Sequence, residues 1–239
     1  MRSAALLLLP ALVIACAAQK DGEYTGESLA RVQGVIGTAD ADSQPPPDAK
    51  VTLVWANFAK DGDTYEAIDG KVTGGFPSTF TLDIVEAPSP AGLNDFTYGG
   101  RRPSESRVGV AYLTAIKAGT KFDPKNEESF IGIAEDDVIV YVDSDVKPNT
   151  HSARFVHGTL KAGFHLMKVV RLSDADKQAA TDAHDACVEA LPEGYTDEQW
   201  LGCPEDGTFD RLVEDEAGMS KNVVLKMAPA DQLDFPNFN

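Results

Sequence analysis

The sequence predicts a mainly β protein, in which an antiparallel β-sandwich carries a helical hairpin packed on it near the C-terminus. Between residues 30 and 172, apolar and polar residues alternate in short runs separated by turn residues, as expected for antiparallel strands. At Ser173 the apolar period lengthens to four residues, which indicates a helix. The apolar share of 43% is enough for a buried core.

Four strands are predicted before the first long connection, over residues 30–37, 50–57, 64–73 and 78–85. The alternation is clearest in the fourth strand, where Phe80, Leu82 and Ile84 share one face and the residues between them are polar. The third is the weakest prediction, because Asp69-Gly70 interrupts it.

The later strands are predicted over residues 107–116, 138–142 and 163–172, and the first two are apolar on both faces. Such strands need cover on both sides. The acidic groups Glu135-Asp136-Asp137 and Asp143-Ser144-Asp145 bracket residues 138–142, and we interpret both as solvated strand ends.

A long helix is predicted to begin at Ser173, which forms a capping box with Asp176, and to stop at Pro192. Small or apolar residues recur every four positions along it, at Ala175, Ala179, Ala183, Cys187 and Leu191. A shorter helix near residues 196–203 completes the hairpin, and a last strand spans 222–227. We expect this hairpin to cover the two-sided strands.

Two of the three cysteines, Cys187 and Cys203, are predicted to form a disulfide. They lie 16 positions apart without a CxxC motif, and an even pair of this kind is typical of an oxidising compartment. On the chain-entropy account, closing such a loop stabilises a protein by about 3 kcal/mol.

The first residues have the layout of a secretory signal, because Arg2 precedes an apolar run too short to span a membrane. The run ends in Val13-Ile14-Ala15-Cys16, which resembles the lipobox of bacterial lipoproteins. The resemblance implies cleavage before Cys16 and acylation of Cys16 by fatty acids such as palmitate, which anchor the chain to a lipid bilayer. Ala17, where Asp would retain the protein in the inner membrane, implies the outer membrane, facing the periplasm or the cell surface.

Residues 32–84 resemble the start of a transthyretin-like, or prealbumin-like, β-sandwich. The resemblance rests on a Val-x-Gly-x-Ile strand, a proline-rich link, the strand Ala-Lys-Val-Thr-Leu-Val-Trp and a Phe-x-Leu-x-Ile strand. Similar layouts occur in uncharacterised lipoproteins of Gram-negative bacteria. The resemblance implies a fold and a location, and it carries no activity.

The formal net charge of −17 makes nucleic acid a poor partner for most of the surface, whereas metal cations, basic peptides or no partner remain open. The best metal candidate is a loop with hard oxygen ligands that suit Ca²⁺, at Asp123, Asn126, Glu127 and Glu128. Its spacing is not that of a calcium loop, and Lys121 and Lys125 intrude, so a loop that no longer binds is the alternative. No other cofactor is predicted.

Two further groups are candidates for binding. The long connection 86–103 carries Phe96, Tyr98, Arg101 and Arg102, which suit a glycan or a peptide, although a plain linker is the alternative. His151, His157 and His165 are near enough in sequence to suggest zinc, against ordinary loop or sheet histidines.

No nucleophile elbow, phosphate loop, dinucleotide fingerprint or HExxH motif occurs in the chain. We therefore expect a non-catalytic binding or structural module that is exported and anchored to a membrane, with an unknown envelope protein or glycan as its partner. The alternatives are a calcium-dependent or glycan- or peptide-binding surface module, and a carboxylate-based hydrolase. The predicted organisation is a signal peptide (1–15), a lipidated tether (16–28), a sandwich (29–172), a disulfide-linked hairpin (173–218) and a final strand with a tail (219–239).

Overall fold

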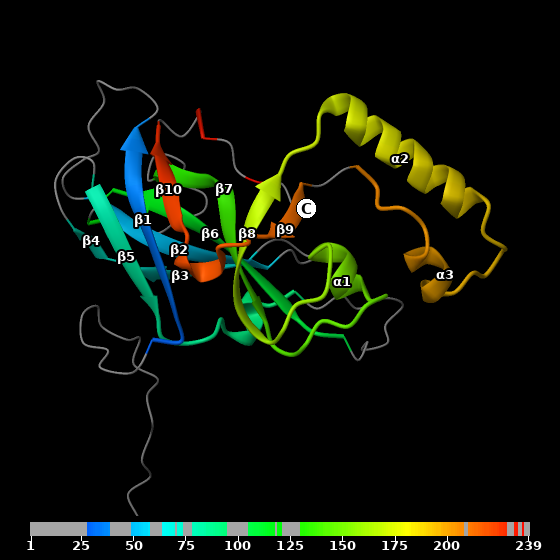
Figure 1. Ribbon diagram of the computed structural model, residues 1–239, viewed down its shortest axis with the longest axis horizontal. Helices are drawn as coiled ribbons and strands as arrows, with labels where there is room; N and C mark the ends of the chain where they lie inside the picture. Colours follow the sequence, from blue (N-terminus) through cyan, green and yellow to red (C-terminus); the bar gives the residue numbers. More distant parts are fainter. Residues whose placement is uncertain are drawn as a thin grey trace, which may run out of the picture.

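The computed structural model describes residues 28–38, 49–57, 64–69, 71–73, 78–94, 105–117, 119–120, 130–207, 210–228, 232–233 and 236. The molecule is mainly β, as predicted (Figure 1). Its strands are β1 (Ala30–Thr38), β2 (Lys50–Asn57), β3 (Thr64–Asp69), β4 (Lys71–Thr73), β5 (Ser78–Ile84), β6 (Val108–Ile116), β7 (Phe130–Val142), β8 (Gly163–Val170), β9 (Arg211–Glu214) and β10 (Asn222–Met227). The helices are α1 (His151–Phe155), α2 (Asp174–Glu189) and α3 (Asp197–Leu201), with 3-10 turns η1 (Pro90–Gly92) and η3 (Gly218–Ser220).

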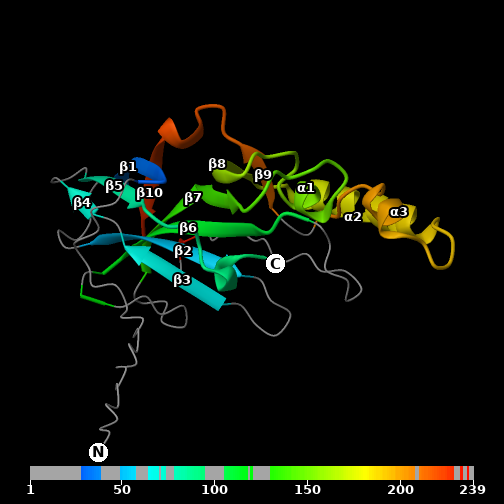
Figure 2. The same cartoon turned by 90° about the horizontal axis from the view of Figure 1, so that it is seen from below.

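The strands join in one curled sheet with the order β3-β2-β6-β7-β10-β1-β5-β4, and β8 branches from β7 to pair with β9 (Figure 2). The two ends of the sheet approach each other, because β2 and β4 are also in contact. Among the described strands, β1 and β10 are the one parallel pair, whereas the prediction was an antiparallel arrangement throughout. These two strands come from opposite ends of the described chain, so no local turn sets their direction.

The main core lies inside the curl, where the predicted inward residues Phe80, Leu82 and Ile84 are buried. Trp55, which is fully buried, lies against Phe164 of β8, with ring centroids 6.2 Å apart. A Cβ at Gly109 would lie 3.1 Å from the Trp55 ring, so this glycine makes room for the indole. The alternating pattern of the sequence therefore identified the inner face correctly.

A second core lies on the outer face of β6 and β7, as the two-sided strands required. Its cover comes from α1 and its flanking residues, including Val146, Val156 and Leu160, and from Leu233 near the C-terminus. The helices expected to supply this cover contribute no residue to it, and no residue of α2 or α3 is buried.

Strand β7 is much longer than the predicted strand 138–142, because it begins at Phe130. Glu135, Asp136 and Asp137 therefore lie within the strand, and their interpretation as a solvated strand end was wrong. Asp137 is 5% exposed. Carboxylates can occupy a buried strand only when cations neutralise them, and Lys221, Lys226 and Arg171 provide that charge here.

Candidate functional site

Several predicted site residues lie outside the described part of the chain and stay predictions. They are the acylation site Cys16, the calcium candidates Asp123, Asn126, Glu127 and Glu128, and the loop candidates Phe96, Tyr98, Arg101 and Arg102. The predicted disulfide between Cys187 and Cys203 is confirmed.

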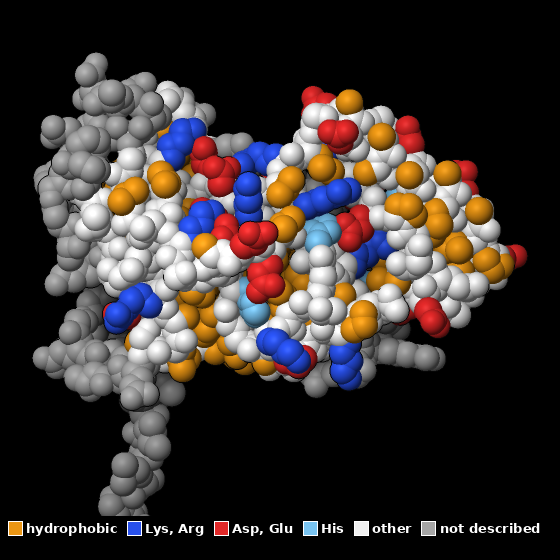
Figure 3. Space-filling view, viewed as in Figure 1, with side chains coloured by type: hydrophobic (Ala, Val, Ile, Leu, Met, Phe, Trp, Pro, Cys, Tyr) orange, Lys and Arg blue, Asp and Glu red, His pale blue; other side chains and the backbone are white. Residues whose placement is uncertain are grey.

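The bridge lies in a segment that we call the arm, residues 173–207, which comprises α2, α3 and the stretch after them. Each helix begins as the sequence predicts: the Ser173 side chain accepts from the amide of Asp176, and Thr196 and Gln199 form a capping box. The arm contains ten carboxylate side chains and one lysine, so it holds about half of the net charge of −17. It stands out from the sheet as a separate lobe (Figure 3).

Only the last part of the stripe predicted along α2 is covered by the rest of the arm. Cys187 and Leu191 of the stripe are half-buried, as is His184 outside it, whereas Ala175, Ala179 and Ala183 are exposed. The chain after α3 comes close to the backbone of α2 at Gly207, where a Cβ would lie 2.1 Å from the carbonyl oxygen of Lys177. The stretch after α3 therefore lies along the Lys177 side of the helix.

Arg154 of α1 joins the arm to the body of the molecule. Its Nη1 donates to the carbonyl oxygens of Trp200 and Cys203, at 3.4 and 3.2 Å, and its Nη2 donates to that of Pro204 at 2.7 Å. The guanidinium carbon also lies 4.2 Å from the centroid of the Trp200 ring. Burial lowers the pKa of Arg154, but it stays charged at neutral pH because that pKa is ordinarily so high.

Three of the four histidines surround this junction. His151 stacks on Trp200 with centroids 5.4 Å apart, and His184 meets the same ring edge-on at 5.8 Å. His184 Nδ1 lies 2.7 Å from the carbonyl oxygen of Pro204, so this nitrogen donates. His157 Nδ1 pairs with Glu205 at 2.7 Å. The contacts of His151 and His157 attach α1 and the residues just after it to the arm, whereas those of His184 lie within the arm.

The zinc hypothesis finds no support in the geometry. His165 points to partners of its own, with Nδ1 2.9 Å from Glu214 and Nε2 2.7 Å from the carbonyl oxygen of Lys161. Within the described ranges, no three His, Cys, Asp or Glu side chains come together as metal ligands.

A second cluster of charges joins β7, the residue after β9 and the residue before β10, where Lys221 bridges two carboxylates. Its Nζ is 2.6 Å from Asp137 and 3.0 Å from Asp215. Burial raises the pKa of Asp137, whereas the hydrogen bond from Lys221 lowers that of Asp215. Burial acts to lower the pKa of Lys221, but its bonds to the two carboxylates outweigh this effect and raise it. The cluster therefore holds its lysine as an ammonium ion.

The neighbouring acids of β7 form two more ion pairs. Lys226 of β10 reaches Glu135 at 2.8 Å, and Arg171 reaches Asp136 at 3.2 Å and the backbone carbonyl oxygen of Glu135 at 2.9 Å. Every acid of the Glu135–Asp137 group thus has a cationic partner.

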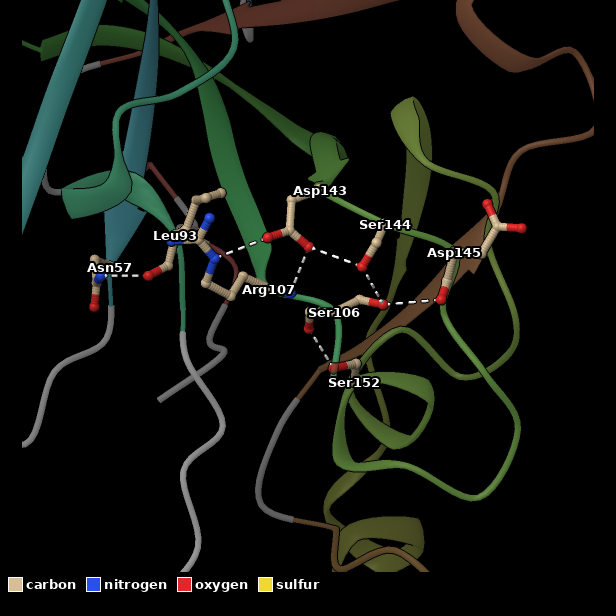
Figure 4. Close-up of polar contacts among 8 residues, drawn as sticks. All are labelled: Asn57, Leu93, Ser106, Arg107, Asp143, Ser144, Asp145 and Ser152. Atoms are coloured by element: carbon tan, nitrogen blue, oxygen red, sulfur yellow. Dashed lines mark hydrogen bonds and ion pairs between the residues drawn. The ribbon is translucent and has the colours of Figure 1, made fainter. Parts of the chain in front are cut away.

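A third polar cluster closes the ends of β6 and β7 (Figure 4). Asp143 accepts from the backbone amide of Arg107 at 2.9 Å and from its Nε at 2.8 Å. Ser144 and Ser106 are linked through their hydroxyl groups at 3.1 Å, and the Ser152 hydroxyl of α1 donates to the carbonyl oxygen of Ser106 at 2.6 Å. Burial opposes ionisation of Asp143, but bonds from Arg107 and Ser144 keep its pKa below the usual range. Asp143 thus holds the ends of β6 and β7 together, and the neighbouring Ser106 binds α1.

Comparison of the chain with protein families, curated proteins and solved structures found no match. In the part of the chain that the structure describes, no helix is both long and apolar enough to cross a membrane.

The two charged sites differ in what they can do. In the Lys221 cluster, the ammonium group lies between the two carboxylates, so each acid has a cationic partner within the protein. At the junction, Arg154 binds backbone carbonyl groups, which is a positioning role. Sequence reasoning missed both residues because their partners are distant in sequence. The carbonyl groups that Arg154 binds lie at least 46 positions away, and Asp137 lies 84 positions from Lys221.

Proposed function

We propose that the protein is an exported lipoprotein, anchored to the outer membrane through acylated Cys16, and that it acts there as a non-catalytic binding or structural module. The observation that best supports export is the Cys187–Cys203 bridge, because disulfides persist in oxidising compartments outside the cytoplasm. The lipobox-like residues Val13 to Cys16 support the anchor.

The position of the first strand agrees with a tether between the lipid and the folded part. Strand β1 begins at Ala30, 14 positions after Cys16. Twelve extended residues reach at most about 40 Å, which is enough to hold the sheet clear of a bilayer surface. We propose that the module is presented to its partner in this way.

The finer fold assignment belongs to the same proposal. We propose that the curled sheet is a sandwich of the transthyretin-like type, and that α2 and α3 are a helical hairpin. Two separate cores, one on each face of β6 and β7, support a layered arrangement. A bridge from the last turn of α2 to Cys203, just after α3, supports the hairpin.

The anchor is tested by fractionation of cells that express full-length variants and are labelled with a palmitate analogue. Cys16→Ser is expected to lose the label and leave the membrane fraction. Ala17→Asp is the matched control, which should keep the label and move to the inner membrane. If Cys16→Ser stays with the membrane, the anchor is not the cysteine and the proposal is wrong.

One observation favours a second candidate, the carboxylate-based hydrolase. The environments of Asp137 and Asp215 move their pKa values in opposite directions, as in acid–base pairs. A panel of p-nitrophenyl esters and glycosides tests it, with Asp137→Asn and Asp215→Asn as the inactivating variants. Turnover by the parent chain that both variants abolish would favour the hydrolase, and no turnover above the buffer rate would remove this candidate.

A further inference from the structure

We propose that docking of the arm is gated by oxidation: the Cys187–Cys203 bridge places the three carbonyl groups that Arg154 binds, so the arm docks on α1 only while the bridge is intact. This inference goes beyond the proposed function. It rests on described residues alone and holds whether or not Cys16 is acylated.

The first step is the nature of the contact between the arm and the body. Neither α2 nor α3 contributes a residue to the two cores, so neither core fastens these helices to the body. The contacts that join it to α1 are polar or aromatic: Arg154 with three carbonyl groups, His157 with Glu205, and His151 with Trp200. Such contacts depend on geometry, because each competes with water.

The second step is where the acceptors lie. Trp200, Cys203 and Pro204 fall within five consecutive positions, and the bridged Cys203 is the middle acceptor. A guanidinium offers its donors in a fixed fork, so it binds these oxygens together only if the backbone holds them in one arrangement. The disulfide ties this backbone to the last turn of α2 and thereby fixes the arrangement.

The third step is what would hold the backbone without the bridge. Helix α3 has five residues, too few for an isolated helix to be stable in water. Other contacts would still connect α2 to the later part of the arm: the edge-on contact of His184 with Trp200, the close approach of Gly207 to Lys177, and hydrogen bonds from His184 to Pro204 and from Gly207 to Thr181. Both hydrogen bonds involve groups that are exposed or partly exposed, so water competes for them.

The chemical change is a thiol–disulfide exchange. A dithiol reductant gives two electrons and two protons to the Cys187–Cys203 bond, which becomes two thiols, while the reductant closes into its own disulfide. The arm then regains the loop entropy that the bridge had removed. We expect Trp200 to leave Arg154 and enter water.

The two tryptophans of the chain make this testable, since Trp200 lies at the junction and Trp55 is fully buried in the main core. Dithiothreitol is added under native conditions, and free thiols are counted alongside the fluorescence. The emission of the parent chain is expected to shift to longer wavelength. Trp200→Phe, which retains Trp55, should show no shift, and the double variant Cys187→Ala/Cys203→Ala should resemble the reduced protein from the start.

The role of Arg154 is tested by asking whether the effect of replacing it and the effect of reducing the disulfide add together. Arg154→Lys keeps the charge but loses the fork of donors, so the oxidised variant should already show the shifted emission and reduction should add little to it. Arg171→Lys is the matched control, because Arg171 also binds a backbone carbonyl group, that of Glu135 on β7. It should respond to reduction as the parent chain does.

Three outcomes would overturn the proposal. The first is reduction of both Cys187 and Cys203 in the parent chain, counted apart from Cys16, with no shift of emission. The second is a shift on reduction in Arg154→Lys as large as in the parent chain, because docking would then not depend on Arg154. The third is a shift in Trp200→Phe, because reduction would then unfold the body together with the arm.

Discussion

At the residue scale, buried charges in this protein are neutralised in pairs. Asp137 is 5% exposed and depends on Lys221, whose side chain is 29% exposed. Arg31 and Asp83 form a contact of the same length, 2.6 Å, on the open surface. The energetic value of an ion pair depends on how far each charge has left water, so these two pairs are unequal despite their equal distances.

Lys221→Met leaves Asp137 buried without its cation. We expect it to lower the free energy of unfolding by about 2 kcal/mol, below the usual cost of breaking a fully buried pair because Lys221 is partly exposed. Arg31→Met is the control and should leave stability nearly unchanged. Urea unfolding measures both, and equal effects of the two substitutions would show that burial of Asp137 is not decisive.

The pH dependence of stability follows from the direction of each pKa shift. Burial raises the folded-state pKa of Asp137, so its contribution is greatest below its unfolded value, about 4, and is lost as pH rises through the folded value. The stability of Asp137→Asn relative to the parent should therefore improve as pH rises above about 4.

Asp215→Asn provides the opposite case. The hydrogen bond from Lys221 lowers the pKa of Asp215, so the carboxylate stabilises the fold above about pH 4, and this is lost as pH falls through the folded value. The variant should match the parent best in acid and fall behind as pH rises. Urea unfolding over a pH series measures both variants, and parallel pH profiles would contradict the assignment.

At the scale of elements, the strands that show alternating apolar and polar residues, bounded by turn residues, were predictable. Residues 50–57 and 222–227 match β2 and β10, and the interruption at Asp69-Gly70 separates β3 from β4. The misses have a common physical cause, which is dependence on distant residues. The cations that pair with the acids in the first half of β7 are remote in sequence, and the parallel pairing of β1 with β10 joins segments more than 180 positions apart.

Short elements were missed for a different reason. Helix α1 has five residues and β9 has four, so neither is long enough to show a period in the sequence. Helix α1 forms because Thr150 caps it and because it covers the second core. Without α1 in the prediction, Arg154 had no assigned place, and the long helix was given the covering role instead.

The pairing of β1 with its neighbours leads to a prediction about its glycines. A Cβ at Gly34 would lie 2.1 Å from the carbonyl oxygen of Val223 and 2.6 Å from the Phe80 ring, whereas at Gly37 the nearest atom would be 3.7 Å away. Gly34→Ala should lower the free energy of unfolding by about 3 kcal/mol through overpacking. Gly37→Ala should change it little. Equal melting temperatures for the two variants would contradict the close approach of β1, β5 and β10.

At the scale of the whole molecule, the structure combines a sheet with two cores and an acidic arm that neither core includes. The sequence predicted the β class, the inner face and the disulfide from composition, period and cysteine count. It did not predict how the arm is attached, because this depends on one arginine and three backbone carbonyl groups. Every residue has a backbone carbonyl group, so the sequence does not indicate which of them bind an arginine.

Calcium distinguishes the main proposal from one of its alternatives. A ligand that binds only the folded state raises the melting temperature. Because we propose a module that does not depend on calcium, we expect the same melting temperature in calcium and in chelator. A rise in calcium that disappears in an Asp123→Asn/Glu127→Gln variant would instead favour the calcium-dependent surface module.

The central claim, that this is an exported and lipid-anchored protein, is tested most directly by mass spectrometry of the mature chain isolated from its membrane. The claim predicts that the N-terminal peptide begins at Cys16 and carries a diacylglyceryl group on sulfur and an acyl group on nitrogen. A chain that retains the residues before Cys16, or begins elsewhere with an unmodified Cys16, would contradict it.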